Sequence, residues 1–215
     1  PDVENIVQGI IQVLSNTSIK ETKLMLEIEK ALWPLKIKNI DIPTFIVAIQ
    51  PNWAMHLFDD TIANQTLFGS NPALMFNTEN VYYRSARPKY PSAPSRVLWY
   101  VSKGKGEYQN TMQLKACSYV DGIDIGTSKE LFRQYKKLGI YSWEQVFEIS
   151  GNDLDKDIMA FLFSKTEVFE NSISNQELQE IWKKDNKKFN IFGPIKISKE
   201  RFFELYSIGQ GKDGK

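Results

Sequence analysis

The spacing of hydrophobic residues divides the chain into two parts. Between residues 4 and 33, apolar side chains recur every three or four positions, which predicts two amphipathic helices. The second helix begins after Ser18, which forms a capping-box pattern with Glu21, and it ends before Pro34. This helix carries several acidic residues, which would face phosphates if it were a DNA-recognition helix. We therefore expect a helical hairpin that packs on a neighbouring domain, with a helix-turn-helix as the less favoured alternative.

From residue 43 onward the pattern changes to short apolar runs separated by turns. Strands are expected at 44–49, 81–84, 96–102, 111–120, 122–125 and 157–167, and helices at 51–58, 128–138, 143–149, 175–184 and 198–206. Three prolines within residues 85–95 exclude a regular element there. Helices and strands alternate irregularly, without a run of βαβ units. The pattern therefore predicts an α+β fold: a small mixed barrel of about five strands with helices on its outside.

The composition excludes several classes of protein. The 215 residues are 42% hydrophobic and 25% charged, as in an ordinary globular domain. One cysteine and one histidine exclude an internal disulfide and any metal site built from cysteines or several histidines. We expect Cys117 to be buried as a small hydrophobic residue and His56 to lie on a helix surface. No apolar run reaches the ~18 residues of a membrane span and no cofactor motif occurs, so we expect no cofactor, no metal, no membrane partner and a cytoplasmic location.

The formal net charge of +1 hides a segregation of charge along the chain. Residues 84–115 contain seven basic residues and one acid, and residues 183–201 contain seven basic residues and two acids. Residues 144–180 contain nine acids and two lysines. Aromatic residues are interleaved with the basic residues of the first segment. Basic side chains bind phosphates and aromatic rings stack on unpaired bases, so this pattern predicts a nucleic-acid-binding surface.

The candidate binding residues come from the first of these basic segments and the strand that leads into it. We expect basic side chains to bind phosphates and a tyrosine to lie near a base, whereas Trp99 sits in an apolar strand and is expected in the core. The candidates are Tyr82, Tyr83, Arg84, Arg87, Lys89, Lys103 and Lys105. No residue is assigned a catalytic role.

Five segments follow one another in an order typical of a known superfamily. They are an opening strand and helix (45–59), a strand ending in arginine (VYYR, 81–84), a central hairpin (96–102 with 113–118), a helical crossover (138–149) and a long last strand (157–174). On these segments the chain resembles the PUA-like superfamily, in particular its ASCH- and EVE-type domains. More narrowly, residues 31–37, 79–84 and 128–143 resemble a bacterial domain often found C-terminal to acetyltransferase-like domains. The start at Pro1 rather than methionine fits a domain cut from such a longer protein.

The resemblance implies a domain organisation and a ligand class. It implies a PUA-like pseudo-barrel over residues 42–208, preceded by residues 1–41 as a helical hairpin or linker and followed by a flexible tail at 209–215. The family fold carries a cleft that binds RNA or modified nucleobases. The resemblance therefore implies nucleic acid or a nucleotide as the partner, with RNA favoured.

Some ASCH-type domains are hydrolases, and their reactive residues are only partly present here. Those enzymes use a lysine after a glycine in the loop that follows the first helix, and a glutamate two residues before the arginine of the next strand. Arg84 matches the arginine, but Tyr82 stands at the glutamate position. The loop at 59–78 contains Gly69 and no lysine. The resemblance therefore supports binding better than hydrolysis.

Three hypotheses about function follow. The first is a binding module for nucleic acid or a modified nucleobase. The second is an ASCH-like hydrolase of RNA or N-acylated cytidines, with Lys165, Thr166 and Glu167, or Glu79, replacing the usual pair. The third is a regulatory domain of a larger acetyltransferase-like protein, in which residues 1–41 contact an upstream domain or a second copy of the chain.

Overall fold

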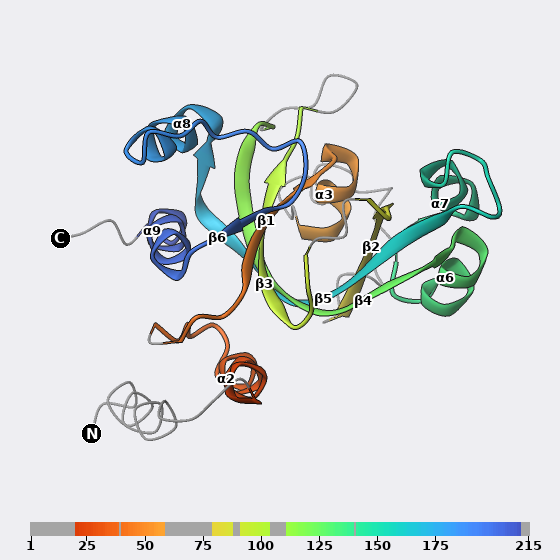
Figure 1. Ribbon diagram of the computed structural model, residues 1–215, viewed down its shortest axis with the longest axis horizontal. Helices are drawn as coiled ribbons and strands as arrows, with labels where there is room; N and C mark the ends of the chain where they lie inside the picture. The colour runs from red at the N-terminus through yellow and green to blue at the C-terminus, as the bar shows by residue number, and fades with distance from the viewer. Residues whose placement is uncertain are drawn as a thin grey trace.

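The computed structural model describes residues 20–38, 40–58, 79–87, 91–103, 111–139 and 141–211. Over these residues a six-stranded mixed sheet is flanked by six helices (Figure 1). The strands are β1 (Thr44–Ile49), β2 (Glu79–Ser85), β3 (Ser95–Val101), β4 (Gln113–Thr127), β5 (Asp157–Ser174) and β6 (Ile195–Ile197). The helices are α2 (Lys20–Ala31), α3 (Pro51–Phe58), α6 (Ser128–Tyr135), α7 (Trp143–Ile149), α8 (Asn175–Lys183) and α9 (Lys199–Gly209).

The strands are ordered β2-β5-β4-β3-β1-β6 across the sheet. The pair β1 and β3 is parallel, and every other neighbouring pair is antiparallel. The expected α+β class is confirmed, but the expected count of five strands is wrong because the three-residue β6 adds to the edge of β1. In the part of the chain described here no ladder joins the edge strands β2 and β6, so the sheet is open rather than closed into a barrel.

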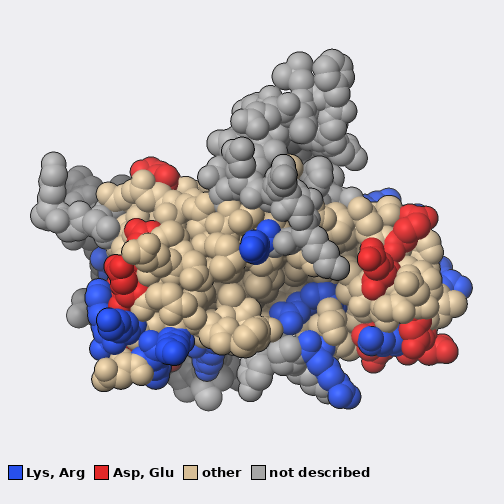
Figure 2. Space-filling model, turned by 90° about the horizontal axis from the view of Figure 1, so that it is seen from above, with Lys and Arg blue, Asp and Glu red and all other residues tan. Residues whose placement is uncertain are grey.

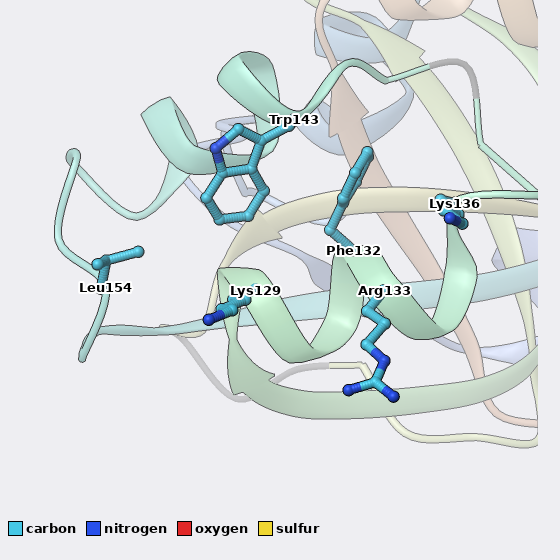
Figure 3. A pocket seen from close by; sticks show the side chains of 6 residues that line it. All are labelled: Lys129, Phe132, Arg133, Lys136, Trp143 and Leu154. Carbon is cyan, nitrogen blue, oxygen red and sulfur yellow. The ribbon is translucent and has the colours of Figure 1, made fainter.

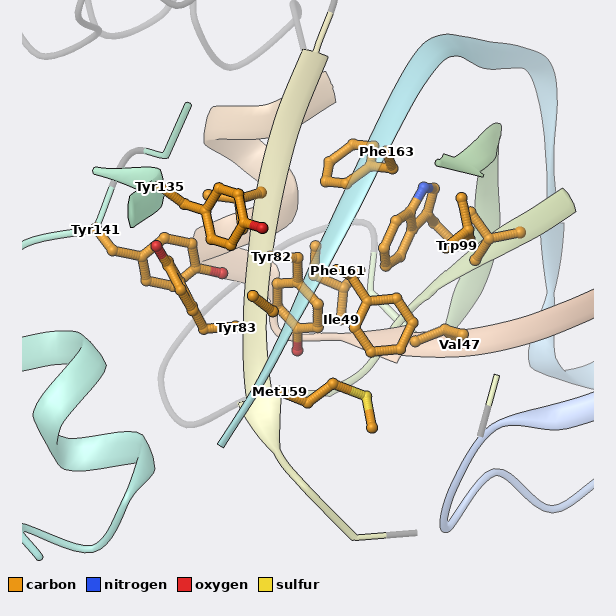
Figure 4. Packing of buried hydrophobic residues seen from close by; sticks show 14 of the residues in the cluster. Val47, Ile49, Tyr82, Tyr83, Trp99, Tyr135, Tyr141, Met159, Phe161 and Phe163 are labelled. Carbon is orange, nitrogen blue, oxygen red and sulfur yellow. The ribbon is translucent and has the colours of Figure 1, made fainter. Parts of the chain in front are cut away.

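Alternate residues of the central strands point to opposite faces of the sheet and so build two hydrophobic cores. Val47 and Trp99 belong to the core on the side of α3, α6 and α7, where Figure 4 shows their side chains with the tyrosine and phenylalanine rings of β2 and β5. Ile46 and Leu98, which directly precede them in the chain, belong to the core under α8 and α9. Cys117 is buried in this second core, as expected.

A buried ion pair fixes α2 to the sheet. Arg96 of β3 and Glu29 of α2 have no exposed side-chain surface, and the Arg96 Nε donates to Glu29 Oε1 at 2.8 Å. Glu29 also accepts hydrogen bonds from the Ile37 amide at 2.7 Å and from the Tyr119 hydroxyl at 2.9 Å. The guanidinium lies over the Phe202 ring, 4.4 Å from its centroid. Arg96 therefore contributes nothing to the basic surface that its sequence segment predicts.

Two of the segments predicted from the sequence fall outside the described residues. The first predicted helix, 4–15, lies outside the described residues, as does the tail beyond residue 211. The predicted contact of residues 1–41 with an upstream domain or a second copy stays a prediction. Residues 20–38 contact the sheet through the side chains of Glu29, Lys30 and Lys36 and through the backbone of Ile37.

Candidate functional site

A pocket of about 230 Å³ lies at the sheet edge where β1 and β3 end. Because these strands are parallel, their carboxyl ends meet, and both the amide and the hydroxyl of Ser102 donate to the Ile49 carbonyl, at 2.9 and 3.1 Å. Pro51 then begins α3 and turns the chain away from the sheet. Nine residues line the pocket: Ala48, Ile49, Gln50, Tyr82, Arg84, Ser85, Ser102, Phe192 and Gly193. Two of these, Tyr82 and Arg84, are candidates from the sequence.

Arg84 is the charged group of this pocket. It lies near the end of β2, opposite Met159 of β5, with its side chain half-buried. Burial lowers the pKa of its guanidinium, an effect that nearby Tyr82 opposes. An arginine remains protonated at neutral pH all the same. None of the described acidic residues forms an ion pair with it. A partly desolvated cation without a carboxylate is suited to an anion or a carbonyl oxygen.

Two aromatic side chains complete the pocket in different ways. Tyr82 is 7% exposed, and its ring packs edge-on against Trp99 with 5.7 Å between the centroids. Burial raises the pKa of its hydroxyl to about 12, so it stays a neutral phenol. Phe192, between α8 and β6, is 95% exposed. A ring this exposed at a pocket wall is free to stack on a flat ligand. Nothing in the sequence pattern singled out Phe192.

The remaining sequence candidates are distributed differently. Tyr83 is 2% exposed, its hydroxyl donates to the Leu131 carbonyl at 3.3 Å, and its side chain lies in the core rather than in the pocket. Arg87 and Lys103 are exposed, each only a few residues from a pocket residue. Lys89 and Lys105 lie outside the described residues. The structure thus brings Tyr82 and Arg84 together and separates Tyr83 from them.

Basic side chains also gather on the outer surface near the middle of the molecule. Figure 2 shows a face that is mostly uncharged, with basic side chains within and below its central hollow. Acidic side chains lie toward the two ends of this face, and further basic side chains lie there too, most of them at the lower left. Basic and acidic side chains are thus mixed at the ends of this face, and Arg96 is withdrawn into the interior.

The carboxylates of the hydrolase hypothesis do not line this pocket. Glu167 pairs with Lys36 at 3.1 Å and accepts hydrogen bonds from Tyr206 at 2.7 Å and Gln210 at 2.8 Å. Thr166 shares a hydrogen bond of 2.8 Å with Ser118. The Glu79 side chain is exposed at the start of β2, beside Ser164 of β5. Glu167 is thus held by three partners in a network that joins β5 to α9 and to the segment after α2.

The described residues form neither a metal site nor a membrane span. No group of three or more histidine, cysteine, aspartate or glutamate side chains there is arranged to hold a metal ion. None of the helices described is both long enough and apolar enough to cross a bilayer.

Known structures share this architecture. The ASCH protein of Zymomonas mobilis aligns over 77% of this chain and 94% of its own length, with a TM-score of 0.54 and 17% sequence identity. The chain therefore shares the fold of this ASCH protein. Two mutants of the same Zymomonas protein align with TM-scores of 0.55 at 16% identity, covering 77% of this chain and 95% and 97% of their own. At this identity the likeness establishes the ASCH-type fold and leaves the ligand open.

Weaker comparisons add nothing to this conclusion. The N-terminal domain of McrB from Staphylothermus marinus aligns with 10% identity and a TM-score of 0.48, which is too low to support an argument. No protein-family model matches the sequence, and no curated protein matches it significantly.

Proposed function

We propose that this chain is a PUA-like module that binds single-stranded nucleic acid, with RNA preferred to DNA, and takes one base into the pocket beside Arg84. The observation that carries the proposal is the half-buried guanidinium of Arg84, which has no acidic partner in the described structure, facing the same pocket as the exposed ring of Phe192. A cation and an aromatic ring together match a base and its phosphate.

Each side chain has a distinct part in this proposal. Arg84 donates charge-assisted hydrogen bonds to a base carbonyl or a phosphate oxygen. Phe192 stacks on the base, an interaction that contributes about 1–3 kcal/mol. Arg87 and Lys103 bind neighbouring phosphates and give no sequence preference. The target is single-stranded because a base in a duplex is stacked and paired, and its removal costs a few kcal/mol.

Binding is favoured over hydrolysis by what lines the pocket. Hydrolysis needs a general acid or base within hydrogen-bonding reach of the reacting atoms. The described lining residues include a guanidinium, an amide, two serine hydroxyls and a buried phenol, but no carboxylate. The preference for RNA rests on the ASCH-type fold alone, so matched oligonucleotides must test it separately.

The test is a fluorescence-anisotropy titration with labelled single-stranded RNA, single-stranded DNA of the same sequence, and duplex. Arg84→Gln keeps two hydrogen-bond donors and removes the positive charge. A hydrogen bond to a charged group contributes ~1.5–3 kcal/mol, so we expect the Kd for the RNA to rise about tenfold or more. Lys23→Gln is the matched control, because Lys23 is an exposed lysine on α2, on the opposite side of the molecule from α3 (Figure 1).

The outcome that contradicts the proposal is equal binding by both variants. Salt provides a second readout: if Arg84 contacts a phosphate, the slope of log Kobs against log salt falls by ~0.7 in the Arg84→Gln protein. An unchanged slope with a weaker Kd assigns Arg84 to the base instead. Equal Kd values for RNA and DNA would overturn the preference for RNA and leave the base pocket intact.

A further inference from the structure

A second groove, of about 460 Å³, lies at the other end of the sheet from α8 and α9, between α6, α7 and the loop that follows α7. Figure 3 shows Phe132 of α6 and Trp143 of α7 facing each other across it, with Leu154 at one end. The rings of Phe132 and Trp143 lie 5.7 Å apart, and Trp143 stacks in turn on Phe147. The groove floor is therefore apolar, and the base pocket shares none of its lining residues.

One wall of the groove is basic. Lys129, Arg133 and Lys136 follow one another at four and three residues along α6 and its last turn, so they lie on one helix face. All three are exposed, and none forms an ion pair with a described residue. Glu130 forms no ion pair with them, and its carboxylate accepts from the backbone amide and the hydroxyl of Thr127 in the α6 capping box. Like charges so spaced repel one another, which favours an acidic partner.

On the opposite side, the lining residues Trp143 and Leu154 have acidic neighbours in the chain. Leu154, 53% exposed, lies between Asp153 and Asp155 in a loop whose residues 151–157 are all exposed. On α7 the side chains of Glu144 and Glu148 are exposed one helical turn apart. Lys156 is the basic residue of this loop, so acids predominate on this side.

We propose that two copies of this chain associate through this surface, which we call the α6–α7 face (residues 129–136, 143–148 and 153–155). A two-fold axis that runs along the groove exchanges its two walls between the copies. Each basic α6 then meets the acidic loop and α7 of its partner, and each exposed Leu154 enters the apolar groove of the other copy. Such an interface is isologous and closed, as in most homodimers.

The charges favour a second copy over nucleic acid at this face. Phosphates attracted to Lys129 and Arg133 would be repelled by the acids across the groove. In a second copy, the carboxylates of Asp153 and Asp155 would meet the basic side chains of α6, and Leu154 between them would contact the apolar floor of the groove. The chain therefore carries both halves of the interface.

Sedimentation velocity of the full chain over a range of concentration and salt tests the proposal. We expect a dimer whose dissociation constant rises with salt, because opposite charges meet across its interface. The double variants Lys129→Glu with Arg133→Glu, and Asp153→Lys with Asp155→Lys, each place like charges in contact, and we expect each to raise the dissociation constant at least about tenfold. An equimolar mixture of the two variants restores opposite charges, and a heterodimer forms.

The matched control is Lys183→Glu with Lys187→Glu, which makes the same change of charge at exposed sites in and after α8 and should leave the dimer unchanged. Circular dichroism of each variant verifies folding, and the mixing experiment itself shows that both variants can still form the interface.

A wild-type chain that is a monomer at every concentration overturns the proposal, and so does a mixture of the variants that stays monomeric. If the α6 variant loses RNA affinity while the mass of the wild-type chain stays that of a monomer, the face binds nucleic acid instead. The base pocket is tested by Arg84→Gln, independently of this outcome.

Discussion

Two arginines, Arg84 of β2 and Arg96 of β3, have very different surroundings in this molecule. Arg84 faces a pocket and has no described acidic partner, whereas Arg96 is sealed inside with Glu29, the Ile37 carbonyl and the Phe202 ring. The charge pattern of the sequence counts both arginines as part of the same basic segment. The distinction depends on Glu29, which is 67 residues from Arg96 in the chain and meets it only in the folded protein.

Glu29→Ala tests the buried pair. Removal of the carboxylate leaves the Arg96 guanidinium buried and uncompensated, so we expect the free energy of unfolding to fall by about 3–5 kcal/mol in urea titrations. The double variant Glu29→Met with Arg96→Met removes both charges and should recover much of this loss. A Glu29→Ala protein as stable as the parent would show that the pair does not carry the attachment of α2.

Stability should fall as the pH rises above about 9, because buried acids keep their protons in the folded chain. Burial raises the pKa of Cys117 from 9.0 and that of Tyr82 from 10.0, each to about 12. The unfolded chain therefore loses these protons first, and stability decreases between the unfolded and folded pKa values, by up to ~1.4 kcal/mol per pH unit for each group. Below pH 9 these groups contribute no dependence on pH.

Cys117→Ala separates the contributions to this profile. The variant loses a little core packing at every pH, but the fall in stability that begins near pH 9 should become shallower. Urea midpoints measured across this range for both proteins provide the comparison. Identical profiles would mean that the Cys117 thiol does not titrate as a buried group.

At the scale of elements, α9 lies unusually close to β5 at one glycine. A Cβ atom at Gly209 would lie 2.5 Å from Cδ2 of Phe169, closer than packed atoms approach. Gly209→Ala should therefore lower stability by about 1–3 kcal/mol in thermal or urea unfolding, although alanine is the better helix former. Adding Phe169→Leu relieves the contact, so the double variant should lose less than the sum of the two single losses. Additive losses would contradict this packing.

Elements with a strong local signal could be predicted from the sequence. The bounds of β1, α3 and α7 are those expected, because a β-branched run, a proline at the first helical turn and a serine cap mark them. The interruption expected near Asp121 is absent, because β4 continues through Gly122 while its register against β5 shifts. The short β6 was missed because three residues carry no periodicity and pair only after β1 is in place.

The candidate site could be predicted only in part. Arg84 was found because basic residues cluster around it and the family arginine matches it. Phe192 was not found, because the sequence around it gives no indication that its side chain is exposed. Neighbouring Tyr82 and Tyr83 point to opposite sides of β2, and both are buried because the edge strand is covered on each side.

At the scale of the whole molecule, the proposed nucleic-acid site and the proposed dimer interface lie on different surfaces. The base pocket lies at the ends of β1 and β3, while the α6–α7 face lies at one end of the sheet (Figure 1). Because the two surfaces share no lining residue, a dimer through the α6–α7 face leaves the lining of the base pocket outside the interface. The near-neutral total charge results from this division and excludes only a partner that coats the entire surface.

The most direct test of the account is photo-crosslinking of a single-stranded RNA that carries 4-thiouridine, followed by mass spectrometry of the crosslinked peptides. The account predicts crosslinks in the peptides that contain Phe192 and Tyr82, and a strong decrease of both in Arg84→Gln at an RNA concentration near the Kd of the wild-type chain. Crosslinks confined to α2 or to the α6–α7 face, with none at the pocket, would contradict it.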